Sequence, residues 1–500
     1  MRASAPLLLL NETNQPGQTD PQNTYGPMEM CYVCNSDTAA DVVCIGNVYV
    51  CKPCAAALIG PSLRGLFRRF APINPLHPKP YDDFVTFHRL EPAGLNPKPR
   101  IIPGEEHVRH SLTEASRIAA AGAFYGQACG DAIGSALNTK ASNLIVDDEA
   151  NIKNALKMPG NTMYGAGQVS GGTQQCVGLA RVLATFRDPL RDADELRRRT
   201  AKMLVEWKKA AFGVDDTTNA ALGHAHSSTL DLYAIYRDDP KCDLKMRINA
   251  LRYSTAQPSV TDTNEAMLRV VPYAIWGYDL APTLLGGIVA DGTLLTHGSF
   301  VCALSAAALA IIIAHIIHHA KEAQREQREQ REQLVQRALE AATNYLVTLS
   351  SSNFHGAENA AVEVKRTIDD AQDYAHQAYN TEFAKIDRTD VFGFGTVGDN
   401  DFSTRWHAAL HAVAFLLTFA SGPNGATLTL DDVFSFCLRF GGDTSATSAI
   451  TGAALGALFT KDNIRKDWMY KVDNYATRTA FDGAHIKAVL PGLLAALHTM

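Results

Sequence analysis

The sequence predicts an all-α body preceded by a small zinc-bound β-ribbon module. Three observations support this fold class. Apolar residues recur at helical spacing from Ser111 almost to the end of the chain. Strand-like alternation is scarce outside one cysteine cluster near the N-terminus, and that cluster has the spacing of a metal site.

The composition is that of an ordinary globular protein. Apolar residues make up 46% and charged residues 20% of the 500 residues, which excludes fibrous, collagen-like and wholly disordered proteins. The net charge of −6 gives no global field that attracts nucleic acid or anionic lipid, so such a partner would need a local patch. Ten cysteines are too few for a disulfide scaffold in a chain of this length.

Shifts in composition divide the chain into four segments. Residues 1–28 are rich in Asn, Gln, Pro, Thr and Gly, and we expect them to be disordered. Residues 29–60 hold the cysteine cluster, and residues 61–110 form a Pro-rich linker. The helical domain spans residues 111–500, with an insertion at about 320–340.

The cysteine cluster predicts a structural zinc site. Two Cys-x2-Cys pairs are separated by sixteen residues, which is the spacing of a four-thiolate zinc site formed by Cys31, Cys34, Cys51 and Cys54. The stretch between Val42 and Tyr49 is rich in β-branched residues and has a Gly-Asn turn, as in a zinc-ribbon hairpin. Bound zinc would supply folding energy that thirty residues cannot obtain from a core. A redox or disulfide role is the alternative.

The function of this module stays open at the sequence level. A small docking domain is the simplest interpretation. Arg64, Arg68 and Arg69 follow it and could contact nucleic acid or a protein partner. We do not expect nucleic-acid binding elsewhere in the chain.

The first helix of the body has a capping-box candidate, Ser111-Leu-Thr-Glu114, at its start. Four glycines then fall four residues apart on one stripe: Gly122, Gly126, Gly130 and Gly134. Each glycine inside a helix costs about 1 kcal/mol relative to alanine. We therefore expect a partner helix or a ligand to lie very close to this backbone.

Six further helices are expected from the apolar periodicity. They are Cys176 to Phe186, Asp194 to Ala211, Phe300 to His319, Thr404 to Phe419, Asp431 to Phe440 and Ser445 to Phe459. The most apolar stretch, Phe300 to Ala314, is shorter than the roughly 20 residues that a bilayer requires. We interpret it as a buried helix, and expect a soluble, intracellular protein, cytoplasmic or nuclear, that binds no membrane.

A low-complexity repeat, Arg-Glu-Gln three times from Arg325, interrupts the body. All its residues favour helices, and its Arg and Glu side chains fall at i,i+4. The repeat predicts a solvated helical extension. A coiled-coil partner site is the alternative, although no apolar heptad seam runs through it.

Four ordered segments resemble the ADP-ribosylglycohydrolase family, which includes the dinitrogenase reductase activating glycohydrolase. They are Gly122 to Gly134, Gly172 to Gln175, Asn264 to Arg269 and Gly441 to Thr447. Shorter similarities occur at Leu295 to His297, Phe394 to Gly398 and Trp468. The resemblance implies an all-α fold with a cleft for two Mg²⁺ ions and ADP-ribose, and an activity that removes ADP-ribose from arginine or serine side chains or cleaves related ADP-ribosyl bonds.

The resemblance also implies which residues contact the ligand and the metals. It assigns ligand binding to Thr263, Asn264, His297, Phe394 and Gly395. In the family, a Thr-Asp-Asp triplet and an Asp-x-Asp-Thr segment hold the metals, and an acid after the first glycine-rich helix contributes in some members. Hard Mg²⁺ ions require such anionic oxygens in a near-octahedral array.

This chain departs from the family pattern at the metal site. Thr173, Gln174 and Gln175 stand where the family has Thr-Asp-Asp, and Asp443, Thr444, Ser445 and Ala446 where it has Asp-Thr-Asp-Thr; Asn138 takes the place of the additional acid. Only Thr173 and Asp443 remain as a residual magnesium site. Because one aspartate instead of four leaves about three charges of two divalent ions uncompensated, Mg²⁺ binding is doubtful.

We therefore hypothesise a degenerate member of the family that is non-catalytic or weakly active and binds ADP-ribose, binds ADP-ribosylated protein, or acts as a scaffold. One alternative is an active Mg²⁺-dependent hydrolase whose site is rebuilt with Asp262 or Glu265. The other is a zinc-ribbon adaptor with an inert helical body.

Several of these residues also have a purely structural interpretation. Asp443 after two glycines can cap a helix, and Thr173 can cap the helix expected from Cys176. His297 can be a satisfied core histidine, and Asp131 can bond to a neighbouring loop. Arg269 can tie the cleft wall to a carboxylate or to main-chain carbonyls, or contact ligand phosphates.

Overall fold

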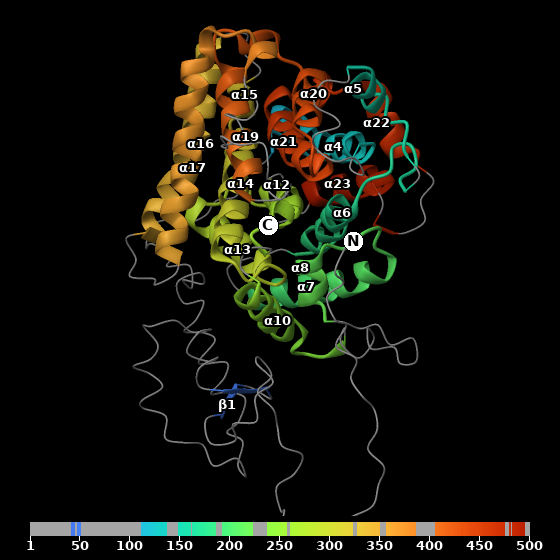
Figure 1. Cartoon of the computed structure of the whole chain (residues 1–500), viewed down its shortest axis with the longest axis vertical. Helices are drawn as coiled ribbons and strands as arrows, with labels where there is room; N and C mark the ends of the chain where they lie inside the picture. Colours follow the sequence, from blue (N-terminus) through green and yellow to red (C-terminus); the bar gives the residue numbers. More distant parts are fainter. Residues whose placement is uncertain are drawn as a thin grey trace, which may run out of the picture.

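The computed structural model describes residues 42–45, 48–51, 112–137, 149–161, 163–186, 193–223, 238–257, 261–323, 328–350, 357–386, 406–475, 480–481 and 483–495. From Leu112 on, the described residues form helices joined by turns and contain no strand, which confirms the all-α body (Figure 1). The helical elements are α4 (Glu114–Ser135), α5 (Glu149–Ala155), α6 (Gly171–Ala184), α7 (Ala193–Ala210), α8 (Asp216–Ala221), α10 (Cys242–Ala256), η4 (Asn264–Arg269), α12 (Val271–Trp276), α13 (Pro282–Thr293), α14 (Phe300–His318), α15 (Ala320–Ala323), α16 (Arg328–Ser350), α17 (Ala357–Gln377), η5 (Ala378–Asn380), η6 (Phe383–Lys385), α19 (Trp406–Ser421), η8 (Gly425–Thr427), α20 (Leu430–Phe440), α21 (Thr444–Phe459), η9 (Lys461–Asn463), α22 (Lys466–Asp473), η10 (Gly483–His485) and α23 (Ile486–Ala495).

Two short strands precede the body. Strand β1 (Val42–Ile45) pairs with β2 (Val48–Cys51) in antiparallel register, Val42 opposite Cys51 and Ile45 opposite Val48. They overlap the stretch from Val42 to Tyr49 for which the sequence predicts a hairpin, and β2 continues two residues beyond it. Cys31, Cys34 and Cys54 lie outside the described residues, as do residues 1–28 and 61–110. The zinc site therefore stays a prediction.

Helix α14 is the centre of the core. Its side chains are apolar nearly all round, and a helix of this kind is stable only when it is covered on every side. It packs against α13, α16, α17 and α12. Among the described residues it is the one helix long and apolar enough to cross a membrane, but 83% of its most apolar stretch is buried inside the fold. The helix expected at this position is thus a core helix.

Helices α16 and α17 form an antiparallel pair along one edge of the body (Figure 1). Helix α16 begins at Arg328 and so includes the end of the Arg-Glu-Gln repeat. Beyond the repeat, Leu334, Ala338 and Leu346 are fully buried, and α16 packs against α14. The region expected as a solvated insertion therefore continues into a helix whose apolar face belongs to the core.

Helices α4 and α21 lie in the closest backbone contact of the body. A side chain at Gly122, Gly126, Gly130 or Gly134 would fall far inside van der Waals distance of a main-chain oxygen of α21: respectively Gly456, Gly452, Ser448 and Thr444. The contacts run in opposite directions along the two helices and repeat every four residues. The glycine stripe thus accommodates a partner helix, one of the two occupants that the sequence allowed.

Helix α4 begins later than its expected capping box. Thr113 has an extended backbone and its hydroxyl accepts a hydrogen bond from the Ser116 N–H at 3.1 Å, so Thr113 is the N-cap. The expectation that Ser111 caps this helix was wrong. The threonine two residues later offers the same hydroxyl acceptor, and the chain turns into the helix there.

The α4–α21 contact predicts a large cost for adding one methyl group to the glycine stripe. Gly126→Ala should lower the free energy of unfolding by about 2–4 kcal/mol, because its Cβ meets backbone that cannot move aside. Urea denaturation measures the change. Gly492→Ala is the matched control: its Cβ would lie 3.6 Å from Ala184 Cβ, an ordinary contact, so this variant should be as stable as the wild type or up to about 1 kcal/mol more stable. Equal effects of the two substitutions would contradict the account.

Candidate functional site

The predicted metal-site residues gather where the N-termini of α6 and α21 meet α4 and η4. We call this region the polar junction. It consists of Asp131 and Ser135 of α4, Ser170 to Gln175 at the start of α6, Glu265 and Arg269 of η4, and Asp443 to Ser445 at the start of α21. Four segments separated by up to about 310 residues of chain thus contribute to one site.

Asp131 is the hydrogen-bonding centre of the polar junction. One carboxylate oxygen accepts from Ser445 Oγ at 2.6 Å and Ser135 Oγ at 3.3 Å. The other accepts from the Ser170 N–H at 2.9 Å and Ser170 Oγ at 3.0 Å. The side chain is fully buried, and burial raises its pKa although these donors act against the shift. Asp131 therefore joins α4 to the first residues of α6 and α21.

Helix α6 starts five residues before the expected Cys176, at Gly171. Ser170 occupies the N-cap position, but its hydroxyl donates to Asp131 instead of capping the helix. Thr173 lies inside the first turn, so the expectation that it caps the helix was wrong. Its hydroxyl is buried, faces Asp131 and lowers the pKa of that carboxyl, although its geometry is not that of a regular hydrogen bond.

The two glutamines at the positions predicted for metal ligands are bonded to the protein. Gln174 Oε1 accepts from Trp207 Nε1 at 3.2 Å and from the Phe212 N–H at 3.0 Å. Gln175 Oε1 accepts from an Arg269 guanidinium nitrogen at 3.1 Å. Both glutamines are buried. Their amide oxygens therefore satisfy buried donors, as buried polar groups must.

Arg269 is itself fully buried. A second guanidinium nitrogen donates to the carbonyl oxygens of Gly292 and Thr293, each at 3.1 Å, and to Thr296 Oγ1 at 2.6 Å. This places Arg269 between α6 and the end of α13. Burial lowers its pKa, while nearby acids act to raise it. The guanidinium is bound by carbonyls, a hydroxyl and an amide, so its fork of donors is largely satisfied by the protein.

Asp443 is the N-cap of α21. Its carboxylate accepts from the Ala446 N–H at 3.1 Å, and the turn before it depends on Gly441 and Gly442 with φ of +78° and +65°. Only glycine adopts such angles without strain. The structural role expected for Asp443 is thus present in the fold. Ser445, the second residue of the same helix, donates to Asp131 as described above.

Three further acids interact with Asp443. Burial, with the charges of Asp131 and Asp215, raises the pKa of Asp443 to about 6. Burial and the charges of Asp215, Asp443 and Asp131 raise the pKa of Glu265 well above its usual range, while Arg269 lowers it. Asp215 caps α8 by accepting from the Thr218 N–H at 2.8 Å, and burial raises its pKa.

Asp215 is the residue that sequence analysis missed. Its position before Asp216-Thr-Thr is a helix-capping signal, but nothing in the sequence connects it with the distant α21 terminus. Glu265 was anticipated as a compensating acid. The number of acids around Asp443 is therefore larger than a residue-by-residue comparison with the family pattern indicates.

The residues expected to contact a ligand are only partly described. His297 is fully buried between Thr263 Oγ1, 3.2 Å from Nε2, and Thr296 Oγ1, 2.9 Å from Nδ1. Burial and the charge of Arg269 lower its pKa well below the usual value, so the imidazole is neutral. Asn264 is fully buried at the start of η4. Phe394, Gly395 and Asn138 lie outside the described residues, and the ligand-binding roles stay predictions.

The residues of the polar junction do not fit a two-magnesium site as they are arranged. Gln174, Gln175 and Ser445 use their oxygens on protein partners, and Asp131 already accepts four hydrogen bonds. Within the described part of the chain, no group of three or more His, Cys, Asp or Glu side chains is placed to hold a metal ion.

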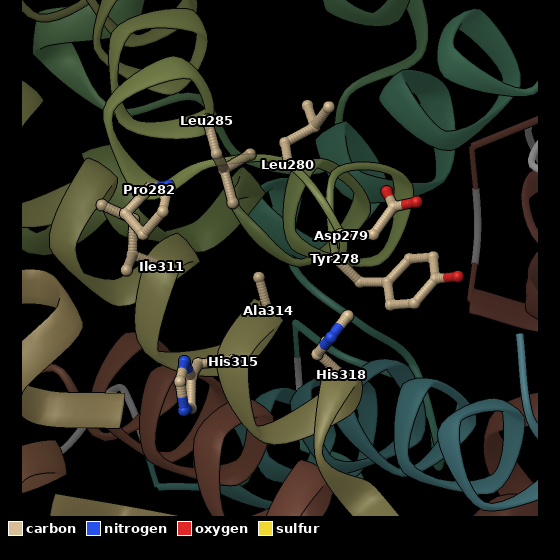
Figure 2. A pocket seen from close by; sticks show the side chains of 9 residues that line it. All are labelled: Tyr278, Asp279, Leu280, Pro282, Leu285, Ile311, Ala314, His315 and His318. Atoms are coloured by element: carbon tan, nitrogen blue, oxygen red, sulfur yellow. The ribbon is translucent and has the colours of Figure 1, made fainter. Parts of the chain in front are cut away.

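A separate cavity of about 120 Å³ lies at the C-terminal end of α14 (Figure 2). It is lined by Tyr278, Asp279, Leu280, Pro282, Leu285, Ile311, Ala314, His315 and His318. Figure 2 shows His315 and His318 projecting from one helix below the apolar side chains of Leu280 and Leu285. The helix rise places this end roughly 25 Å from the α14 terminus beside His297. None of the predicted site residues lines the cavity.

Comparisons with known proteins point to one family. The sequence model of that family, ADP-ribosylglycohydrolase, matches residues 112–497. A solved structure described as an "ADP-ribosylglycohydrolase-related protein complex" is similar at 16% sequence identity and a TM-score of 0.46, over 78% of this chain and 99% of that chain. No curated protein matches the chain.

The raised pKa of Asp443 predicts how stability depends on pH. The pKa of this acid is 3.8 in the unfolded chain and about 6 in the fold, so its ionisation favours the unfolded chain. The free energy of unfolding should therefore fall as pH rises from about 4 to 6. Asp443→Asn keeps a good N-cap without the charge that opposes Asp131, Asp215 and Glu265. It should raise the free energy of unfolding by about 1–2 kcal/mol at pH 7.5 and by much less at pH 4.

Denaturant melts at both pH values measure this difference. Asp462→Asn, which removes an exposed acid from η9, is the control and should change stability little at either pH. A loss of stability in Asp443→Asn at pH 7.5 would contradict the prediction and show that the fold stabilises the ionised carboxylate.

Proposed function

Because the chain belongs to the ADP-ribosylglycohydrolase family, we propose that it is a degenerate member that binds ADP-ribose or ADP-ribosylated protein, or serves as a scaffold, with little or no hydrolase activity. The proposal includes an intracellular location and a structural zinc ion at Cys31, Cys34, Cys51 and Cys54.

One observation carries this proposal. At the positions where family resemblance implies metal-binding aspartates, Gln174, Gln175 and Ser445 are bonded to Trp207 and Phe212, to Arg269 and to Asp131. Freeing these oxygens for a metal would leave buried donors without partners, which costs about 1–3 kcal/mol for each group. The neutral side chains therefore support a site that is stable without ions.

A second candidate function has specific support. Asp215 and Glu265 add carboxyl groups beside Asp443, so a rebuilt site for a divalent ion would not depend on Asp443 alone. The alternative function is therefore that of an active Mg²⁺-dependent hydrolase, which would remove ADP-ribose from modified side chains. The third possibility, a zinc-ribbon adaptor with an inert helical body, depends on residues outside the described part of the chain.

Release of ADP-ribose from serine- and arginine-modified peptides distinguishes the first two functions. With Mg²⁺ in millimolar excess, we expect no release by the wild type above the level of a heat-inactivated sample, because the ligand oxygens are engaged elsewhere. Release that disappears with EDTA and in Asp443→Ala would instead establish the active alternative. Calorimetric titration with ADP-ribose, with and without Mg²⁺, then separates an ADP-ribose-binding protein from an inert body.

Restoring the family residues should create magnesium binding. The variant Gln174→Asp, Gln175→Asp, Ser445→Asp and Ala446→Thr should be less stable than the wild type without Mg²⁺. The carboxylate introduced by Ser445→Asp would face the carboxylate of Asp131, and Arg269 would lose its amide partner. Mg²⁺ should raise the melting temperature of this variant by mass action and leave that of the wild type unchanged.

A matched variant with asparagine in place of the three new aspartates, and with the same Ala446→Thr change, controls for side-chain shortening. It should be destabilised but should not respond to Mg²⁺. If the aspartate variant also ignores Mg²⁺, the correspondence between these positions and the family's metal ligands is wrong.

A further inference from the structure

Two aromatic side chains meet at the edge of the polar junction. The rings of Tyr164 and Phe212 lie edge to face, with centroids 4.8 Å apart and planes at 62°, a favourable aromatic geometry. Both are half-buried. Burial and the charges of Asp131, Asp443 and Glu265 raise the pKa of Tyr164.

Gln174 fixes the position of Phe212. Its amide oxygen accepts both the Phe212 N–H and the indole N–H of Trp207, which is fully buried in α7. The start of α6 approaches this loop so closely that a side chain at Gly171 would collide with the Gly213 carbonyl. The backbone of Phe212 is therefore tied to α6 through one buried amide.

Asn161 fixes Tyr164 in a similar way. Its amide oxygen accepts from the Met163 N–H at 2.7 Å and the Tyr164 N–H at 2.8 Å, and its amide nitrogen donates to the Ser135 carbonyl at 2.8 Å. Ser135 is the last residue of α4 and also contacts Asp131. The Tyr164 loop is thus attached to the same helix that organises the polar junction.

The aromatic pair faces a partly open edge. Gly213, next to Phe212, has a φ of +79° and nothing within 4 Å of where a side chain would begin. Met163, next to Tyr164, is 58% exposed. The backbones of both aromatic residues are held by hydrogen bonds, and their rings are partly exposed. Walls of ligand-binding sites have this arrangement, with apolar faces beside a few convergent polar groups.

We propose that Gln174 is a positioning residue that holds the Tyr164–Phe212 pair as the wall against which a planar group of the ligand stacks. This inference rests on the proposed function, since it takes ADP-ribose as the ligand, and the planar group is then its adenine base. The amide that stands in place of a metal-binding carboxylate would thereby contribute to ligand binding through the protein itself.

Two substitutions at one position test the inference by calorimetry with ADP-ribose. Gln174→Met keeps the side-chain size but removes the acceptor, and should weaken binding about tenfold, the effect of losing one stacked base. Gln174→Glu keeps an acceptor oxygen and should retain the affinity within about threefold. Adenosine should show the same dependence, whereas ribose 5-phosphate, which lacks the base, should bind both variants as it binds the wild type.

A spectroscopic readout separates positioning from general destabilisation. The chain has four tryptophans, so the indole N–H resonance of Trp207 can be assigned after ¹⁵N-tryptophan labelling. It should shift in Gln174→Met and stay in place in Phe212→Leu, which should lose affinity equally. Gln127→Met, which removes another buried glutamine bonded to Leu268 and Cys176, should lower the melting temperature without moving this resonance.

Unchanged ADP-ribose affinity in Gln174→Met or Phe212→Leu overturns the inference. If the wild type binds no ADP-ribose, the proposed ligand is wrong, and the positioning role is then judged from the ring-to-ring nuclear Overhauser contact of Tyr164 and Phe212. Loss of this contact in Gln174→Met, with its recovery in Gln174→Glu, supports the positioning role. Persistence of the contact in Gln174→Met overturns it.

Discussion

The backbone contact between α4 and α21 determines where the polar junction can form. Each glycine of α4 faces a main-chain oxygen of α21 with no room for a side chain, so the two helices have one register. In that register the last turn of α4 lies against the first turn of α21, and Thr444 Oγ1 donates to the Gly134 carbonyl at 2.8 Å. Ser445 is then within 2.6 Å of Asp131. A shift of one helical turn, about 5.4 Å, would separate these groups. The polar network therefore depends on the packing register of α4 and α21.

Sequence analysis anticipated the features that depend on local pattern. The helical class, the close approach at the glycine stripe and the buried apolar helix from Phe300 follow from periodicity and composition. Two helix starts were misplaced because the local sequence allows more than one start. Thr113 and Ser111 both offer a capping hydroxyl. Gly171 and Gly172 are typical of a turn, but in the fold Trp207 and Leu268 pack against them. Asp215 could not be anticipated, because its role beside Asp443 exists only after α8 has packed in place.

The neutral side chains at the positions where the family resemblance implies metal ligands are joined to the fold by hydrogen bonds to three different segments. Gln174 reaches the end of α7, Gln175 reaches Arg269 in η4, and Ser445 reaches α4. Each of these hydrogen bonds has one donor and a preferred angle. The two amide oxygens and the serine hydroxyl therefore form a network of directed contacts with the protein itself. Such a network holds its geometry without a ligand, and each member that changes leaves a buried partner unsatisfied.

The polar junction also contains several acids. Asp131 accepts four hydrogen bonds from hydroxyl and N–H donors. Burial and the charges of neighbouring acids raise the pKa of Asp443 and Glu265, and Arg269, which lowers the pKa of Asp215 and Glu265, is largely occupied by the main chain and Gln175. A set of like charges without enough compensation holds protons more tightly or attracts a cation. Protonation of Glu265 requires no bound cation, because its pKa already lies well above the usual range. The polar junction thus carries less negative charge than its number of carboxylates indicates.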